Sequence, residues 1–197
     1  MRQEKRRQAT REHLLATAER LFALHGFDET TVDDIVEAAD LAKGTFYYHF
    51  QSKDELAETL IRQIIGQASQ QAQEALAGGA SPVAALRLCF SELARLGEQH
   101  THLLPAMLNF NQAFKREPPA GQPSMRRFLL PLLAAGQQAG QLRTDMETIE
   151  LVQMLGLLFV YACMAWRGDR AGLSLNTHMQ HALAIFLEGA LTGEKPS

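Results

Sequence analysis

A short polar and aromatic stretch near residue 45 carries the side chains best suited to bind a ligand. Five hydrogen-bond donors follow one another closely there: Lys43, Thr45, Tyr47, Tyr48 and His49. Ammonium, hydroxyl and imidazole groups donate hydrogen bonds to phosphate oxygens and to the edges of nucleic-acid bases. These groups need not act together in catalysis. The stretch therefore predicts a helix that rests on a negatively charged partner.

The same stretch contains residues that hold such a helix in place. Phe46 and Phe50 are four residues apart, so they share one face of a helix, which we expect to be buried. Gly44 lies inside the helix, where glycine is about 1 kcal/mol less favourable than alanine. Close approach of the backbone to another surface is one reason to place a glycine there.

Two helices are predicted before this stretch. Residues 1–10 form a polar arm, which either enters a minor groove or is a frayed tail. A helix over 9–25 follows, and Gly26 ends it. Thr31 is expected to cap a second helix through a capping box with Asp34, and the free amides at that end also suit a phosphate.

A turn at residues 40–41 joins the second helix to the third, which is helix-turn-helix geometry. In that geometry the third helix enters the major groove of DNA through its N-terminal residues. Lys43 and Thr45 are therefore the expected readers of base edges, and Gly44 permits the close approach. The expected phosphate contacts come from the other donors of this helix and from the starts of the second and fourth helices. They are Thr31, Tyr47, Tyr48, His49 and Lys53.

The run Gly-Thr-Phe-Tyr-Tyr-His-Phe over 44–50, with Ser52-Lys53 just after it, resembles the recognition helix of the TetR family of transcriptional regulators. The resemblance covers residues 8–60. Family members commonly carry a serine where this chain has Ala42, so one N-cap or phosphate contact is missing here. The resemblance implies an all-helical dimer that acts as a repressor.

The rest of the chain reads as a second helical unit. A long helix over 53–77 leads to it, and Gly78-Gly79 end that helix. Further helices are predicted over 82–96 and from Thr101, which is expected to be the cap, to about 112. Another ends at about 139 and has a kink or break at Pro131, and the next begins with a capping box of Thr144 with Glu147. Residues 115–123 form a proline-rich loop.

The last two helices are the most apolar elements. Leu151 to Trp166 is apolar on every face, so we expect it to be buried on every face. It is shorter than the ~20 residues that span a bilayer, so no membrane partner is expected. With a final helix over 175–191 it is predicted to form a homodimer interface of four helices. We expect the final helix to contribute Leu175, Met179, Leu183, Phe186, Leu187 and Leu191.

Charge and composition fit this organisation. Of the 197 residues 46% are hydrophobic, and the net charge is −3. Residues 1–20 hold six bases against three acids, whereas 28–40 hold six acids and no base. The bases thus flank the recognition stretch, and the acids are expected to face away from DNA. The N-terminus lacks an apolar secretory segment, which predicts a cytoplasmic protein.

Other motifs give little support to catalysis or to cofactors. No nucleophile, zinc-protease or phosphate-loop motif is present, so we predict that the protein is not an enzyme and has no cofactor or metal. His100-Thr-His102 would bind a metal only if extended, because residues two apart on a helix point apart. Cys89 and Cys163 are far apart and are expected to be buried thiols, with redox sensing as the alternative.

The predicted fold is all-α, with a helix-turn-helix DNA-binding domain over 1–53 and a helical ligand-binding and dimerisation domain over 54–197. The predicted function is that of a dimeric repressor that a neutral or weakly polar ligand releases from palindromic double-stranded DNA. Control by cysteine oxidation or by a protein partner is the alternative. The candidate ligand-binding residues, which mix apolar surface with a few polar groups, are Phe90, Met107, Phe110, Asn111 and Tyr161.

Overall fold

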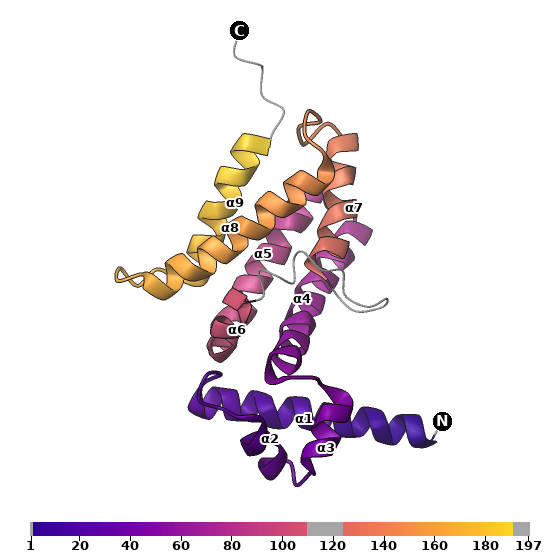
Figure 1. Cartoon of the computed structure of the whole chain (residues 1–197). Coiled ribbons are helices and arrows are strands. Elements are labelled where there is room, and N and C mark those ends of the chain that lie inside the picture. The colour runs from indigo at the N-terminus through magenta and orange to yellow at the C-terminus, as the bar shows by residue number, and fades with distance from the viewer. Residues whose placement is uncertain (1, 110–123, 191–197) are drawn as a thin grey trace. The chain divides into compact units, whose positions relative to one another are not determined.

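The computed structural model describes residues 2–109 and 124–190, and within these ranges the chain is helical with no strand. The described residues form two compact units, one of residues 2–61 with 100–109, the other of 62–99 with 124–190. Figure 1 shows the helices along the chain. The all-helical prediction is confirmed. The predicted boundary after residue 53 differs from this division, in which the first unit also takes up a later segment.

The first unit contains the three predicted N-terminal helices. They are α1 (Arg2–His25), α2 (Val32–Ala38) and α3 (Lys43–His49), followed by the start of α4 (Lys53–Ala77). The short 3₁₀ helix η1 (Thr101–Leu103) and α6 (Leu104–Asn109) complete the unit, and η1 packs on α1.

Helix α1 begins at Arg2, so the expected arm of residues 1–10 is helical from that point. An ion pair between side chains one helical turn apart stabilises this first part of α1, since Arg7 lies 2.6 Å from Glu4. Its apolar stripe is buried as predicted, with Leu14 and Phe22 fully inaccessible. Gly26 adopts φ +87° just past the helix end, a conformation that glycine takes without strain.

The turn between α2 and α3 is tight because one residue adopts a left-handed conformation. Asp40 has φ 53°, and aspartate tolerates that region better than most residues. Phe46 and Phe50 then point inward, with relative exposures of 0% and 1%. They anchor α3 against its unit and leave its opposite face outside.

The second unit is a bundle of α5 (Pro82–Gln99), α7 (Met125–Gln138), α8 (Thr148–Gly168) and α9 (Leu175–Ala190). Helix α9 packs on both α5 and α8, and α7 packs on α5 and α8. Figure 1 shows α8 in orange and α9 in yellow along one side of this bundle.

Two local predictions in this part of the chain were wrong, and a third was wrong in part. Thr101 does not cap a helix, because it lies inside η1 and His100 is the N-cap residue. The capping box of α8 is formed by Glu147 and Glu150, so the predicted Thr144 box is absent. Helix α7 does not end at Pro131, which lies on its exposed side, and the alternative of a kink at this residue stays a prediction. The predicted loop over 115–123 lies outside the described residues.

The α9 residues expected at a subunit interface are used inside the chain instead. The described members of that set are at most 6% exposed, namely Leu175, Met179, Leu183, Phe186 and Leu187; Leu191 lies outside the described residues. Helix α8 is long and apolar enough to cross a membrane by length and composition, as is also common for a core helix of a soluble protein. It packs against α7 and α9 in this unit.

Candidate nucleic-acid interface

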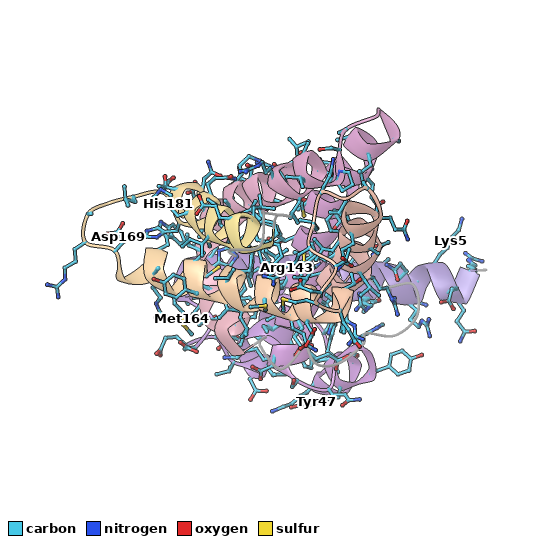
Figure 2. All side chains as sticks on the ribbon, turned by 90° about the horizontal axis from the view of Figure 1, so that it is seen from above. Lys5, Tyr47, Arg143, Met164, Asp169 and His181 are labelled. Carbon is cyan, nitrogen blue, oxygen red and sulfur yellow. The ribbon has the colours of Figure 1, made fainter. Side chains whose placement is uncertain are left out.

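Helix α3 presents an exposed aromatic and polar face. Tyr47 and Tyr48 are 51% and 70% exposed, and Thr45 and His49 beside them are half-buried. Figure 2 labels Tyr47 at the outer edge of its unit. The exposed hydroxyl groups of two adjacent tyrosines are free to donate hydrogen bonds to a partner outside the chain. The structure thus brings together the residues that the sequence singled out on this helix.

Lys43 at the start of α3 forms an ion pair that another anion can replace. Its Nζ lies 2.7 Å from Asp33 Oδ1 of α2, and both side chains are more than half exposed. The hydrogen bond to Asp33 raises the pKa of Lys43, which stays charged. An exposed pair of this kind is screened by water and contributes little to stability, so a phosphate or a guanine edge can compete for the ammonium.

Gly44 has no steric reason within the described chain to lack a side chain. A Cβ built on it meets nothing within 4 Å, and its backbone is helical. This fits the prediction that the glycine serves a surface outside the chain. Ala42 is the N-cap residue of α3 and makes no side-chain cap hydrogen bond, as its methyl side chain requires.

Thr31 is already used as the cap of α2. Its Oγ1 accepts from the Asp34 amide at 3.2 Å and donates to Asp34 Oδ2 at 2.7 Å, while its own amide donates to Oδ2 at 2.7 Å. These hydrogen bonds lower the pKa of Asp34. The predicted capping box is confirmed, and a phosphate contact of Thr31 stays a prediction.

Lys53 donates hydrogen bonds to three main-chain carbonyls of its own unit. Its ammonium donates to the carbonyls of Phe27 at 2.6 Å, Asp28 at 3.2 Å and Thr30 at 2.8 Å, and it lies 4.3 Å from the centre of the Phe27 ring. An ammonium has three protons, so this arrangement uses its full donor capacity. Lys53 ties the start of α4 to the loop between α1 and α2, a role that sequence reasoning missed.

The first turns of α1 form one wall of a polar hollow of about 500 Å³ beside α3. Burial, then the charges of Arg11 and Arg7, lower the pKa of His49, which is one of the lining residues. The basic residues of α1 thus lie near the recognition helix, which their charge alone had indicated. The hollow is lined by Gln3, Glu4, Arg6, Arg7, Thr10, Thr45, Tyr48 and His49.

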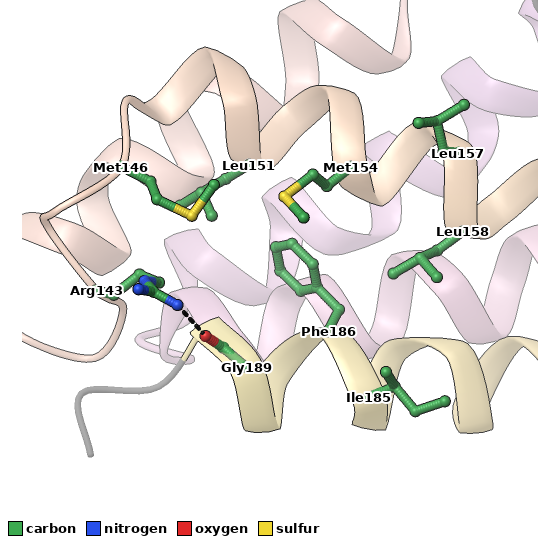
Figure 3. Close-up of a pocket in the computed structure, with 9 residues that line it drawn as sticks. All are labelled: Arg143, Met146, Leu151, Met154, Leu157, Leu158, Ile185, Phe186 and Gly189. Atoms are coloured by element: carbon green, nitrogen blue, oxygen red, sulfur yellow. Dashed lines mark hydrogen bonds between the residues drawn. The ribbon is translucent and has the colours of Figure 1, made fainter. Parts of the chain in front are cut away.

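A separate apolar surface lies on α8 and α9 of the second unit. Helix α8 exposes a stripe with helical spacing, and Ile185 of α9 is 65% exposed beside it. Figure 3 shows a hollow here, bounded at one end by Arg143, which donates to the Gly189 carbonyl at 2.8 Å. The exposed stripe, which includes Met164 labelled in Figure 2, consists of Met154, Leu157, Tyr161 and Met164.

The candidate ligand-binding residues fall in different places. Phe90 of α5 is buried against Phe159, with ring centres 6.3 Å apart. Met107 is buried in α6 of the first unit, whereas Tyr161 is 65% exposed on α8. Phe110 and Asn111 lie outside the described residues. A ligand role for these residues stays a prediction.

Comparison with models of protein families identifies the family to which this chain belongs. A family model described as bacterial regulatory proteins of the tetR family matches residues 14–60. A second, described as the C-terminal domain of TetR/AcrR family transcriptional repressors, matches residues 62–189. The chain belongs to the TetR family. The two TetR models together cover both the helix-turn-helix and the C-terminal helical region, so the resemblance seen at the recognition helix is confirmed.

Individual relatives agree with the family assignment. The transcriptional repressor KstR2 of Mycolicibacterium smegmatis is 26% identical over 192 residues, which cover 91% of this chain and 89% of KstR2. The structure is similar to that of Thermus thermophilus FadR, a TetR-family repressor in complex with lauroyl-CoA, with TM-score 0.76, 25% identity and coverage of 95% and 98%. It also resembles KstR2 of Mycobacterium tuberculosis, a ketosteroid transcriptional regulator, with TM-score 0.56, 25% identity and coverage of 93% and 95%.

Proposed function

We propose that this TetR-family repressor binds a pseudo-palindromic operator as a homodimer, with one α3 in each half-site. The exposed row of donors on α3 supports this proposal most directly. Thr45 and Lys43 at the N-terminal end of α3 suit base edges, whereas Tyr47 and Tyr48 suit phosphates. Two copies of such a helix, related by a two-fold axis, read half-sites ~34–36 Å apart or a multiple of that distance.

The dimer is proposed to form through the exposed apolar stripe on α8 together with Ile185 of α9. Single exposed apolar residues are ordinary, but Met154, Leu157, Tyr161 and Met164 follow one another on one helical face. A two-fold interface brings this stripe against its own copy. These are the two helices that the sequence predicted for the interface. On α9, however, the proposed interface uses Ile185, not the residues predicted from sequence, which are buried inside the chain.

The effector is proposed to be a small molecule with an apolar acyl chain. The support is the likeness to FadR of Thermus thermophilus, whose structure contains lauroyl-CoA. The sequence predicted a neutral or weakly polar ligand, which describes the acyl chain but not the anionic CoA group. Comparing lauroyl-CoA, free laurate and CoA as displacers of bound DNA distinguishes the two descriptions.

The alternative of control by cysteine oxidation has little structural support. Cys89 and Cys163 are free thiols with exposures of 0% and 2%. Burial raises the pKa of each to about 12. The thiolate is the form that oxidants attack, so buried thiols of this kind are inert. A cytoplasmic location, where thiols stay reduced, follows from the proposed role on DNA.

The deciding experiment is selection of binding sites from a random pool of duplexes, followed by affinity measurements across a salt series. Enrichment of a palindrome is expected. The logarithm of the binding constant should fall with the logarithm of salt concentration by about 0.9 for each phosphate contacted. A pool that shows no enrichment with the ligand-free protein would refute the proposed operator binding in that state. Repeating the selection with lauroyl-CoA tests whether ligand is required instead.

A further inference from the structure

Two histidines and a glutamate meet in the first unit, outside the DNA-binding surface described above. Glu19 comes from α1, and His100 and His102 come from the start of η1. One ligand atom from each lies within 4.8 Å of the other two. All three side chains are half-buried. Among the described residues, no other group of three histidine, cysteine or acidic side chains is close enough to share a metal ion.

The backbone removes the objection that histidines two residues apart point away from each other. That objection holds inside a helix, but His100 has φ −115° and ψ 42° and precedes the 3₁₀ helix. The two imidazole rings therefore lie on the same side, with centres 5.7 Å apart. His100 Nδ1 is 2.9 Å from Glu19 Oε1.

One ring nitrogen of each histidine is buried and makes no hydrogen bond within the protein. His102 Nε2 has no partner, and His100 Nδ1 has only Glu19 Oε1 close to it, as an ion-pair contact at 2.9 Å without hydrogen-bonding geometry. Buried polar atoms without a partner are rare and call for an unseen one. A cation that accepts lone pairs from two imidazoles and a carboxylate would satisfy all three groups at once.

We propose that Glu19, His100 and His102 bind a divalent transition-metal ion, with Zn²⁺ as the best fit. Imidazole and carboxylate ligands suit Zn²⁺, Co²⁺ and Ni²⁺, whereas Mg²⁺ and Ca²⁺ prefer oxygen ligands alone. Tetrahedral Zn²⁺ with bonds of about 2.0–2.2 Å places its ligand atoms about 3.4 Å apart. Small side-chain rotations bring the three atoms to that spacing, and the fourth position is left for water or an external ligand.

The position of the site gives the ion a structural consequence. The chain returns to the first unit at His100, immediately after α5, and η1 packs there on α1. A metal bound to all three residues fastens this return to the helix that carries the basic residues beside α3. The bound ion therefore stabilises the association of η1 with α1.

The test uses full-length protein without a histidine tag, freed of metal by a chelator, and no DNA. Titration calorimetry with Zn²⁺ should show one ion per chain, and Co²⁺ should give the visible absorption of a tetrahedral site. Glu19→Gln and His102→Ala should each weaken Zn²⁺ binding by about tenfold or more. Zn²⁺ should raise the urea midpoint of the wild type but not that of Glu19→Gln.

The matched control is His25→Ala, which removes an exposed histidine at the end of the same α1. It should bind Zn²⁺ as the wild type does. The proposal is overturned if the wild type binds neither Zn²⁺ nor Co²⁺, or if His25→Ala and Glu19→Gln lose affinity equally. Because Glu19→Gln preserves side-chain size, it keeps the test valid should His102→Ala fail to fold. DNA binding plays no part in the readout, so this test stands or falls apart from the proposed operator binding.

Discussion

At the scale of single residues, the polar groups around α3 differ in whether the chain already uses them. Tyr47 and Tyr48 are exposed, and Lys43 holds an exposed partner that a ligand can displace. Lys53 and Thr31 instead serve the protein's own backbone. Residues of one chemical type therefore have different expected effects on DNA binding and on stability, and substitutions can separate them.

Gly44→Ala should stabilise the protein and weaken DNA binding. The new methyl group meets no atom within 4 Å, and alanine is favoured over glycine by about 1 kcal/mol in a helix interior and by less in the first turn, where Gly44 lies. On DNA the same methyl group would stand between the α3 backbone and the groove. An affinity loss of about tenfold, or about 1.4 kcal/mol, is expected. Urea unfolding and fluorescence anisotropy with an operator duplex measure the two effects.

Gly168→Ala is the matched control for this change. Gly168 lies at the end of α8, and a Cβ there also meets nothing within 4 Å. Operator affinity should be unaffected. Equal affinity of Gly44→Ala and wild type would show that α3 does not approach DNA through this glycine.

Lys53→Met should destabilise the first unit rather than act mainly on DNA. The substitution keeps most of the aliphatic stem but removes donors to the carbonyls of Phe27, Asp28 and Thr30. Because Lys53 is only half-buried, water can take over part of these hydrogen bonds, and the total loss in unfolding free energy should be about 2–3 kcal/mol, close to that of one fully buried hydrogen bond of a charged donor. Lys43→Met breaks only an exposed ion pair, so its unfolding free energy should stay close to that of the wild type.

Unfolding curves and salt-dependent DNA affinities of both variants decide between the two roles of Lys53. A phosphate contact, the role expected from sequence, predicts unchanged stability and a salt slope smaller by about one unit. That result would make the hydrogen bonds to the loop incidental. Lower stability with an unchanged slope would assign Lys53 to the fold.

Cys89 and Cys163 should be unreactive in the folded protein. With each pKa raised to about 12 by burial, the thiolate fraction at pH 8 is about one in ten thousand. A thiol reagent should label neither cysteine until urea unfolds the chain. Mild peroxide should also leave operator binding intact. Rapid labelling in native buffer, or peroxide-induced release that Cys→Ser variants abolish, would favour the redox alternative.

At the scale of elements, the outer face of α8 should control assembly. Leu157 is 58% exposed in the single chain, so Leu157→Asp should fold but disrupt a dimer that buries this stripe. Burying one leucine contributes about 2 kcal/mol, and a two-fold interface contains two, so dimerisation should weaken by roughly a thousandfold. Sedimentation velocity across a concentration series measures the change.

Leu24→Asp provides the control for that substitution, because Leu24 is 65% exposed on α1. It should sediment as the wild type does. A wild type that is monomeric at all concentrations, or a Leu157→Asp variant that dimerises normally, would remove α8 from the proposed interface.

The elements also show where sequence reasoning works. The stripes of α1 and α2 and the paired phenylalanines of α3 follow helical spacing and are buried as predicted, because each helix needs one apolar face toward its unit. The Thr31 box was found because threonine, aspartate and a following apolar run occur together. The recognition helix and its exposed donors were therefore accessible from sequence.

Predictions from sequence fail where two neighbouring residues are about equally able to cap a helix, or where a contact joins distant segments. Both Thr144 and Glu147 can open α8, and the structure uses Glu147, whose carboxylate caps in a box with Glu150. The roles of Lys53, and of the cluster of Glu19 with His100 and His102, depend on segments that are far apart in sequence. No periodicity reports such contacts, because they arise only when loops and helix ends meet in the folded unit.

At the scale of the whole molecule, the chain passes between the two units three times, after residues 61, 99 and 109. Helix α4 continues without a break from the first unit into the second, and the chain returns to the first after α5. A continuous helix is stiff, so under the proposed function α4 is the element that would carry a change from one unit to the other. A ligand that prefers a conformation with the wrong spacing of recognition helices would then shift the population away from the DNA-bound form.

This coupling must be reciprocal if lauroyl-CoA is the effector. A ligand that lowers operator affinity by some factor obliges the operator to lower ligand affinity by the same factor, typically between about 5 and 150. Calorimetric titration of lauroyl-CoA should therefore show weaker binding with saturating operator duplex than with a scrambled duplex. CoA and laurate, tested separately, show which part of the molecule carries the preference. Displacement of DNA with no change in ligand affinity would break this equality, and it would mean that lauroyl-CoA acts on the protein by some route other than a shift between two folded states.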